Sequence, residues 1–283
     1  MYSKNIDNLI SKADTKIIKG LAIVLMLMHH LWAFLNRIAV NLNYIFTIFG
    51  QSSIVYIGAF GKICVSIFFF IGGYGTYLNC VSKEYDIVDR MKKLYCSYWK
   101  VFLVFIPIAF LLFSNQPAYC EDNVIYSRFA SFSWQEFWGN FWGVNINYNR
   151  EWWFLSSYVI ALCSFPIVKK FCQKSSSITN ICIIIIASIL VTNVFPAIGS
   201  IECIGNLNNN FLYSRLICQT APYVSSFWMG IIVAKDGLLN QLKQSMINSR
   251  FLNPFADIIV WVAVIYLRQL QIPVDLSTDS AWS

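Results

Sequence analysis

The chain has 283 residues, of which 57% are hydrophobic and only 12% are charged, and its mean hydropathy is +0.56. Soluble globular domains carry about 25% charged residues, so this composition excludes an ordinary soluble fold. The net charge of +7 does not indicate nucleic-acid binding, because the basic residues are spread over short segments between apolar stretches.

Seven apolar stretches have a length that suits a membrane. A helix needs about 20 mostly apolar residues to cross a bilayer. The stretches that meet or approach this length are, in chain order, Gly20–Leu35, Ile63–Ser82, Leu94–Phe113, Trp152–Val168, Ile178–Ile201, Leu216–Ala234 and Pro254–Leu267. The sequence therefore predicts an all-α polytopic transmembrane bundle of about seven spans, in a single domain over residues 1–283.

The lysines and arginines indicate an orientation. If the N-terminus is cytoplasmic, the inner segments hold 15 of the 21 basic residues and the outer segments hold 6. This asymmetry matches the positive-inside rule, so a cytoplasmic N-terminus is predicted. Residues 1–16 are too polar for a cleaved secretory signal, so the first span is expected to remain in a multi-pass protein of the membrane.

The first stretch, "KGLAIVLMLMHHLW", carries the two histidines of the chain, His29 and His30. Lys19 and His30 are 11 residues apart, which on a helix places them within about 20° of one face and about 16 Å apart along the axis. A cation at the cytoplasmic mouth and an imidazole near mid-membrane then line one side of a cleft that opens to the cytosol. His29 lies about 100° away and is expected to be structural.

Two interpretations of His30 stay open. Ionisable groups within the hydrocarbon region are costly and rarely face lipid, so His30 could be hydrogen-bonded between helices as a structural residue. An imidazole also titrates near neutral pH and can take a proton from a hydroxyl, while a lysine such as Lys19 can hold a phosphate. The shared helix face of Lys19 and His30, which would line one cleft, favours the catalytic interpretation of His30.

A second basic group lies in "DRMKKLYCSYWK", at the predicted cytoplasmic end of the third span. The segment holds four cations, Arg90, Lys92, Lys93 and Lys100, which could be topology determinants only. Next to a cleft they could also bind the phosphates of a coenzyme.

The long outer loop from Ser114 to Glu151 contains "SWQEFWGNFWGV", whose aromatic residues follow the spacing of a one-faced helix. Ser133 and Glu136 fit a capping box at its start. A Trp-rich amphipathic helix lying flat in the membrane interface is predicted, as an anchor or as a substrate-holding element. In "REWWF", Trp152 and Trp153 fit an interfacial aromatic belt, and aromatic faces also stack on sugar rings.

The nine cysteines form no CxxC pair and no metal-like spacing, so no metal site is expected. Cys120 and Cys203 both fall in predicted outer loops. A disulfide between them and two free thiols are both compatible with the sequence.

Several segments together resemble one family. "KGLAIVLMLMHH" (19–30), "FFFIGGYGTYL" (68–78), "DRMKKLYCSYW" (89–99) and "WWFLSSYVIALCSFPIV" (152–168) occur in the order seen in the acyltransferase-3 family of integral membrane proteins, and "FWMGIIVAKDGLL" (227–239) is similar to a later segment. The chain departs from the family pattern at four positions, where the family commonly has arginine, serine, arginine and proline: Lys19, Gly72, Lys93 and Cys96.

The resemblance implies an enzyme that transfers an acyl group, commonly acetyl, from cytosolic acetyl-CoA to a hydroxyl of a surface glycan or its lipid-linked precursor. His30 would be the catalytic base, by direct transfer or through an acyl-histidine. Lys19, Arg90 and Lys93 would bind the phosphates of the acyl-CoA donor, and Trp153 would bind the acceptor. The donor is a substrate, so no permanently bound cofactor and no metal is expected.

The protein is expected to lie in lipid, as a multi-pass protein of a bacterial inner membrane, with no nucleic-acid partner. Because the family usually carries more spans, the chain is expected to be incomplete at its C-terminus. Two other readings are a transporter or exporter of a small metabolite and an inactive truncated remnant. A transporter would often show two similar halves with broken spans, and the sequence shows no internal repeat.

Overall fold

The computed structural model describes residues 10–33, 47–48, 51–114, 119–121, 124–126, 128–201, 205, 207 and 213–241. The main helices are α1 (Lys12–Trp32), α2 (Ser53–Gly61), α3 (Ile63–Ser82), α4 (Ile87–Phe113), α5 (Trp134–Phe141), α6 (Trp153–Lys174), α7 (Ser177–Ile189), α8 (Phe195–Gly199) and α10 (Ala221–Asp236). Shorter helical segments are the 3₁₀ turn η2 (Arg150–Trp152) and the π-helical segments η3 (Leu190–Val194) and η6 (Ser214–Thr220). The helical fold class is confirmed for the described residues.

In the part of the chain that the structure describes, two small antiparallel hairpins interrupt the helices. Strands β1 (Thr47–Ile48) and β2 (Gln51–Ser52) pair with each other, and so do β3 (Tyr119–Glu121) and β4 (Val124–Tyr126). The sequence analysis did not predict them. Strands of two or three residues are too short to show the alternation by which a strand is recognised.

Among the described residues, six helices are long and apolar enough to cross a membrane: Lys12–Trp32, Ile54–Val81, Ile87–Phe113, Arg150–Lys174, Ser177–Gly199 and Ser214–Asp236. The seventh predicted span, Pro254–Leu267, lies outside the described residues. The cytoplasmic N-terminus stays a prediction. The second span starts earlier than predicted, because α2 precedes α3 and only a turn at Lys62 separates them.

The chain forms two compact units. The first contains Met1–Asn79, Ser175–Ile184 and Ser225–Ser283, and the second contains Cys80–Lys174 and Ile185–Val224.

In the first unit, α1 packs against α2. A Ser11–Asp14 capping box begins α1, where the Ser11 hydroxyl accepts from the Asp14 amide and the Asp14 carboxylate accepts from the Ser11 amide. The helices approach closely because α2 presents Gly58 and Gly61, where a Cβ atom would collide with the α1 backbone. Small residues at such a crossing let two membrane helices gain van der Waals contact.

Glycines also allow α3 and α10 of the first unit to approach each other closely. A Cβ atom on Gly73 would collide with the backbone of Phe227, and one on Gly230 would collide with the backbone of Phe70 and Tyr74. These positions belong to "FFFIGGYGTYL" and "FWMGIIVAKDGLL", two of the segments that carry the family resemblance. The fold thus brings together motifs about 150 residues apart, through glycines whose role is packing.

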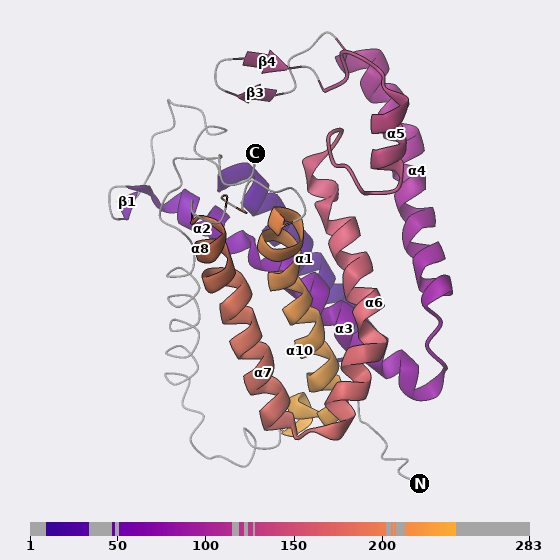
Figure 1. Ribbon diagram of the computed structural model, residues 1–283, viewed down its shortest axis with the longest axis vertical. Coiled ribbons are helices and arrows are strands. Elements are labelled where there is room, and N and C mark those ends of the chain that lie inside the picture. The colour runs from indigo at the N-terminus through magenta and orange to yellow at the C-terminus, as the bar shows by residue number, and fades with distance from the viewer. Residues whose placement is uncertain are drawn as a thin grey trace. The chain divides into compact units, whose positions relative to one another are not determined.

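In the second unit, α5 runs beside α4 (Figure 1). Near its end, the Tyr98 hydroxyl donates to the carbonyl of Asn140 at 2.6 Å, and the Trp99 indole donates to the carbonyl of Phe141 at 2.9 Å. Near its start, Phe132 contacts Phe110 of α4, with ring centroids 5.6 Å apart. These contacts span about 17 Å of α4, at about 1.5 Å per residue.

The prediction of a flat interfacial helix is therefore corrected, because α5 lies along a candidate span. Its aromatic stripe is divided. Phe137 and Phe141 pack on Phe102 of α4, with ring centroids 5.4 and 5.6 Å apart, while Trp134 and Trp138 are exposed. The spacing of the aromatic residues predicted the stripe, but it could not show that Phe137 and Phe141 pack on α4.

The N-terminus of α5 agrees only in part with the predicted capping box. The amide of Glu136 donates to the Ser133 hydroxyl at 3.5 Å, as expected of an N-cap. The Glu136 carboxylate instead accepts from the Asn147 amide side chain at 3.4 Å. It therefore ties α5 to the loop that follows it.

Candidate active site

The first predicted pair lies on one helix, as expected. Lys19 and His30 both belong to α1, which is helical without interruption from Lys12 to Trp32. Lys19 is exposed and His30 is partly buried. Eleven residues of continuous helix keep the two side chains on one face, about 16 Å apart along the axis.

His29 has a different environment from His30. Its Nδ1 atom lies 3.0 Å from the carbonyl oxygen of Gly58 in α2. Since a carbonyl only accepts, Nδ1 carries the proton and donates. The two histidine rings meet edge to face with centroids 5.4 Å apart. His29 thus has the interhelical contact expected of it, and it buttresses the ring of His30.

Arg90 and Lys93 begin α4 in the second unit, and their surroundings differ. Lys93 Nζ forms an ion pair with Asp89 Oδ2 at 2.6 Å, and the side chains are 75% and 52% exposed. The guanidinium of Arg90 is partly buried and lies over the ring of Tyr85, 5.4 Å from its centroid. Arg90 is therefore held against the protein, whereas Lys93 reaches into the surroundings with a carboxylate beside it.

Tyr85 fixes the approach to α4. Its hydroxyl donates to the carbonyl of Leu162 in α6 at 2.7 Å, and its ring packs on Phe165 with centroids 4.5 Å apart. Burial raises the pKa of the Tyr85 phenol to about 12, and the charge of Arg90 opposes this rise. The phenol is therefore neutral at physiological pH and keeps its donor hydrogen. Sequence reasoning missed Tyr85, which no periodic pattern marks.

The two tryptophans that start α6 have separate roles. Trp152 is packed into the aromatic core around Phe102, Ile106 and Tyr148. Trp153 instead contacts Tyr223 in α10, with ring centroids 5.1 Å apart. Of the two, Trp153 is the one outside that core cluster, and it is the residue predicted to bind the acceptor.

A polar network that sequence reasoning missed reaches the backbone carbonyl of Trp153. Arg215, only 9% exposed, donates from Nη2 to the Ser156 hydroxyl at 3.0 Å, and that hydroxyl donates to the carbonyl of Trp153. The buried hydroxyls of Ser157 and Thr220 bond at 2.8 Å, and Thr220 donates to the carbonyl of Arg215.

The spacing of this network explains why it was missed. In the sequence, Arg215 directly precedes the charge-free stretch Leu216–Ala234. The structure places it in the π-helical segment η6, where residues 215 and 220 are one wide turn apart. A π-helical turn often marks a functional position, and it has no periodicity that a sequence pattern reveals.

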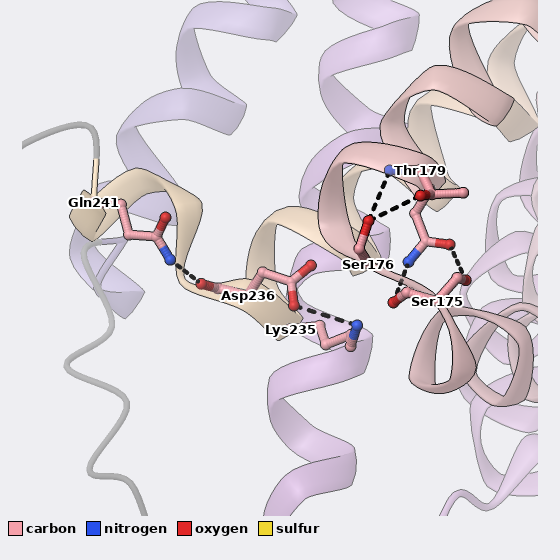
Figure 2. Close-up of polar contacts among 7 residues, drawn as sticks. Ser175, Ser176, Thr179, Lys235, Asp236 and Gln241 are labelled. Carbon is pink, nitrogen blue, oxygen red and sulfur yellow. Dashed lines mark hydrogen bonds and ion pairs between the residues drawn. The ribbon is translucent and has the colours of Figure 1, made fainter.

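A mostly buried ion pair lies at the end of α10 in the first unit (Figure 2). Lys235 Nζ and Asp236 Oδ1 are 3.2 Å apart, with side chains 17% and 15% exposed. Gln241 donates to the backbone carbonyl of Asp236, and Ser175, Ser176 and Thr179 form hydrogen bonds where α7 begins. The ion pair thus lies at the C-terminal end of α10, the hydroxyl groups lie at the start of α7, and the second carboxylate oxygen of Asp236 is buried without a hydrogen-bond partner.

Six cysteines in the described part of the chain have free thiols: Cys64, Cys80, Cys96, Cys163, Cys172 and Cys182. Cys203 lies outside the described residues, so its pairing with Cys120 stays open. Among the described residues, no cluster of three His, Cys, Asp or Glu side chains could hold a metal ion.

The predicted site residues are shared between the units. Lys19 and His30 belong to the first, and Arg90, Lys93 and Trp153 to the second. Within the second unit, Arg90 lies over Tyr85, which contacts the middle of α6 at Leu162, whereas Trp153 begins α6 nine residues earlier in the chain.

The apolar helices define an integral membrane protein, with basic and aromatic side chains placed at helix ends. A family model described as an acyltransferase domain, that of the acyltransferase-3 family, matches residues 13–280, and the chain belongs to this family. It is therefore a membrane acyltransferase in general terms. No curated protein and no solved structure matches the chain.

Proposed function

We propose that the protein is a membrane O-acyltransferase that moves an acetyl or other acyl group from cytosolic acyl-CoA to a hydroxyl of a cell-surface glycan or its lipid-linked precursor. The observation that carries this proposal is the shared face of Lys19 and His30 on α1, in a chain that belongs to an acyltransferase family. A cation and a base on one face suit a charged thioester donor that enters from one side of the membrane.

In the proposed reaction, His30 removes the proton of the acceptor hydroxyl as its oxygen attacks the thioester carbonyl carbon. The carbon–sulfur bond breaks, and the leaving thiolate takes the proton back from the imidazolium. The products are an O-ester on the sugar and free coenzyme A. In the alternative mechanism, the acyl group is first transferred from the thioester to the imidazole and then from the imidazole to the acceptor hydroxyl, with the same products.

Donor and acceptor are assigned to different groups of residues. Lys19, Arg90 and Lys93 engage the phosphates of acyl-CoA, supported by their positions near helix starts on the side that charge bias assigns to the cytosol. Trp153 engages the acceptor sugar, supported by its contact with Tyr223 outside the aromatic core cluster. The enzyme would work in the inner membrane of a bacterium.

The test uses the full chain in liposomes with acetyl-CoA labelled on the acetyl group and a candidate glycan. The label is expected on the glycan as an alkali-labile ester. If it crosses the membrane as an intact small molecule and never becomes attached, the protein is a transporter and the proposal fails. The His30→Ala variant is the control for enzyme-dependent label.

A further inference from the structure

Two cations of the second unit lie over a pair of packed aromatic rings. The rings are Tyr85, in the turn before α4, and Phe165, fully buried on α6. Arg90 lies over Tyr85, and Lys169 Nζ lies 6.0 Å from the centroid of Phe165. Lys169 is one helical turn after Phe165, so a cation at the start of α4 and a cation in the C-terminal half of α6 lie over the same pair of rings.

The way Lys169 is held leaves its charge available. An aromatic face attracts a cation through its quadrupole, but it carries no net charge and does not neutralise the ammonium. In the part of the chain that the structure describes, Lys169 forms no ion pair with a carboxylate. Lys93, by contrast, has the Asp89 carboxylate at 2.6 Å, which would repel an incoming anion.

Partial burial strengthens the bond that a cation such as Lys169 can form with a phosphate group. Lys169 is partly buried, whereas its neighbour Lys170 is exposed. Partly desolvated cations form stronger charge-assisted bonds with phosphate than exposed ones, which water and salt screen. Arg90 is also partly buried, so the two cations offer a multiply charged ligand a firmer site than the exposed lysines near them.

We propose that Lys169 joins Arg90 in binding the phosphate groups of the acyl-CoA donor, against the Tyr85–Phe165 ring pair. The proposal rests on the proposed function, because that function supplies the donor. It assigns a binding role to a residue outside every sequence motif singled out for donor binding. Lys169 lies one residue beyond "WWFLSSYVIALCSFPIV" and reaches Arg90 only through the contact between Tyr85 and α6.

The experiment measures binding of coenzyme A to the purified full chain in detergent by calorimetry. Removing one partly desolvated phosphate contact is expected to weaken binding about tenfold, so Lys169→Ala should raise the Kd by this amount. Lys170→Ala, the matched control with the same charge change one residue away, should raise it no more than about twofold. Acetylpantetheine, which lacks the nucleotide and its phosphates, should bind both variants and the wild type equally.

A second variant separates charge from packing. Lys169→Met keeps an unbranched side chain on Phe165 and removes the charge, so it should lose as much affinity as Lys169→Ala. Equal coenzyme A affinity in Lys169→Ala and Lys170→Ala, or full affinity in Lys169→Met, overturns the assignment of Lys169 and leaves the proposed function standing. No coenzyme A binding by the wild type overturns both, since the donor itself is then wrong.

Discussion

The ring of His29 and the carbonyl oxygen of Gly58 lie 3.0 Å apart and join α1 to α2. The bond occupies Nδ1 of His29, one residue before the proposed base. We therefore expect His29→Ala to lower the free energy of unfolding by about 1 kcal/mol, the usual value of one interhelical hydrogen bond. Thermal unfolding in detergent measures this.

The same pair of variants separates stability from catalysis. His30→Ala should abolish acetyl transfer while the protein inserts and melts as the wild type does. His29→Ala should retain most of its transfer rate at temperatures below its unfolding transition. A His30→Ala protein that is as poorly inserted as it is inactive would assign His30 a structural role instead.

The α3–α10 crossing predicts an asymmetric response to adding a methyl group. Gly73→Ala should destabilise the protein by about 1–3 kcal/mol, since the new Cβ meets the Phe227 backbone, which cannot yield as a flexible side chain would. Gly75→Ala on the same helix meets nothing within 4 Å and should be neutral or slightly stabilising. Comparing melting temperatures tests the crossing, and equal melting temperatures would argue against it.

Because Arg90 and Lys93 differ in burial, their substitution by alanine is expected to change the apparent KM for acetyl-CoA by different amounts. Arg90→Ala should raise the apparent KM for acetyl-CoA about tenfold, as expected for loss of a partly desolvated contact. Lys93→Ala should raise it less than about fivefold, because the exposed ammonium is screened by water. Both effects should shrink in high salt, and steady-state rates at two salt concentrations check this. A larger effect at Lys93 than at Arg90 would reverse the assignment.

Trp152 and Trp153 offer a matched comparison for the acceptor. Trp153→Ala should raise the KM for the acceptor by up to about tenfold with little change for acetyl-CoA, since an aromatic contact contributes about 0.5–1.5 kcal/mol. Trp152→Ala should instead destabilise the fold by about 3–5 kcal/mol, because its ring packs against Phe102 and Tyr98. Acceptor titrations and melting curves separate the two, and an unchanged acceptor KM in Trp153→Ala removes its assigned role.

The distribution of basic residues predicts that β3 lies on the outer side of the membrane and that the C-terminal end of α6 lies in the cytosol. In intact cells, a membrane-impermeant thiol reagent should label Cys120 in a variant whose other cysteines are serine. A variant with Lys170→Cys as its sole cysteine should be labelled only after permeabilisation. Labelling of Cys120 only after permeabilisation would invert the orientation.

The sequence by itself determined the class of protein and its helices. Apolar runs of about 20 residues fix membrane spans, because the bilayer core leaves the backbone no other partner than itself. The Lys19–His30 face followed as well, since it depends only on the regular rotation of one helix. The acyltransferase-3 motifs were visible for the same reason, as local strings of residues, and the family assignment bears them out.

Only the tertiary structure decided which neighbouring residues differ in role. His29 differs from His30 because Gly58 approaches one of them, and Trp152 differs from Trp153 because Phe102 packs on one of them. Lys169 and Arg215 acquire their surroundings from residues about 60 to 80 positions away, through Tyr85 and Ser156. Such contacts depend on how helices pack, and a short-range sequence pattern does not record which face of one helix meets another.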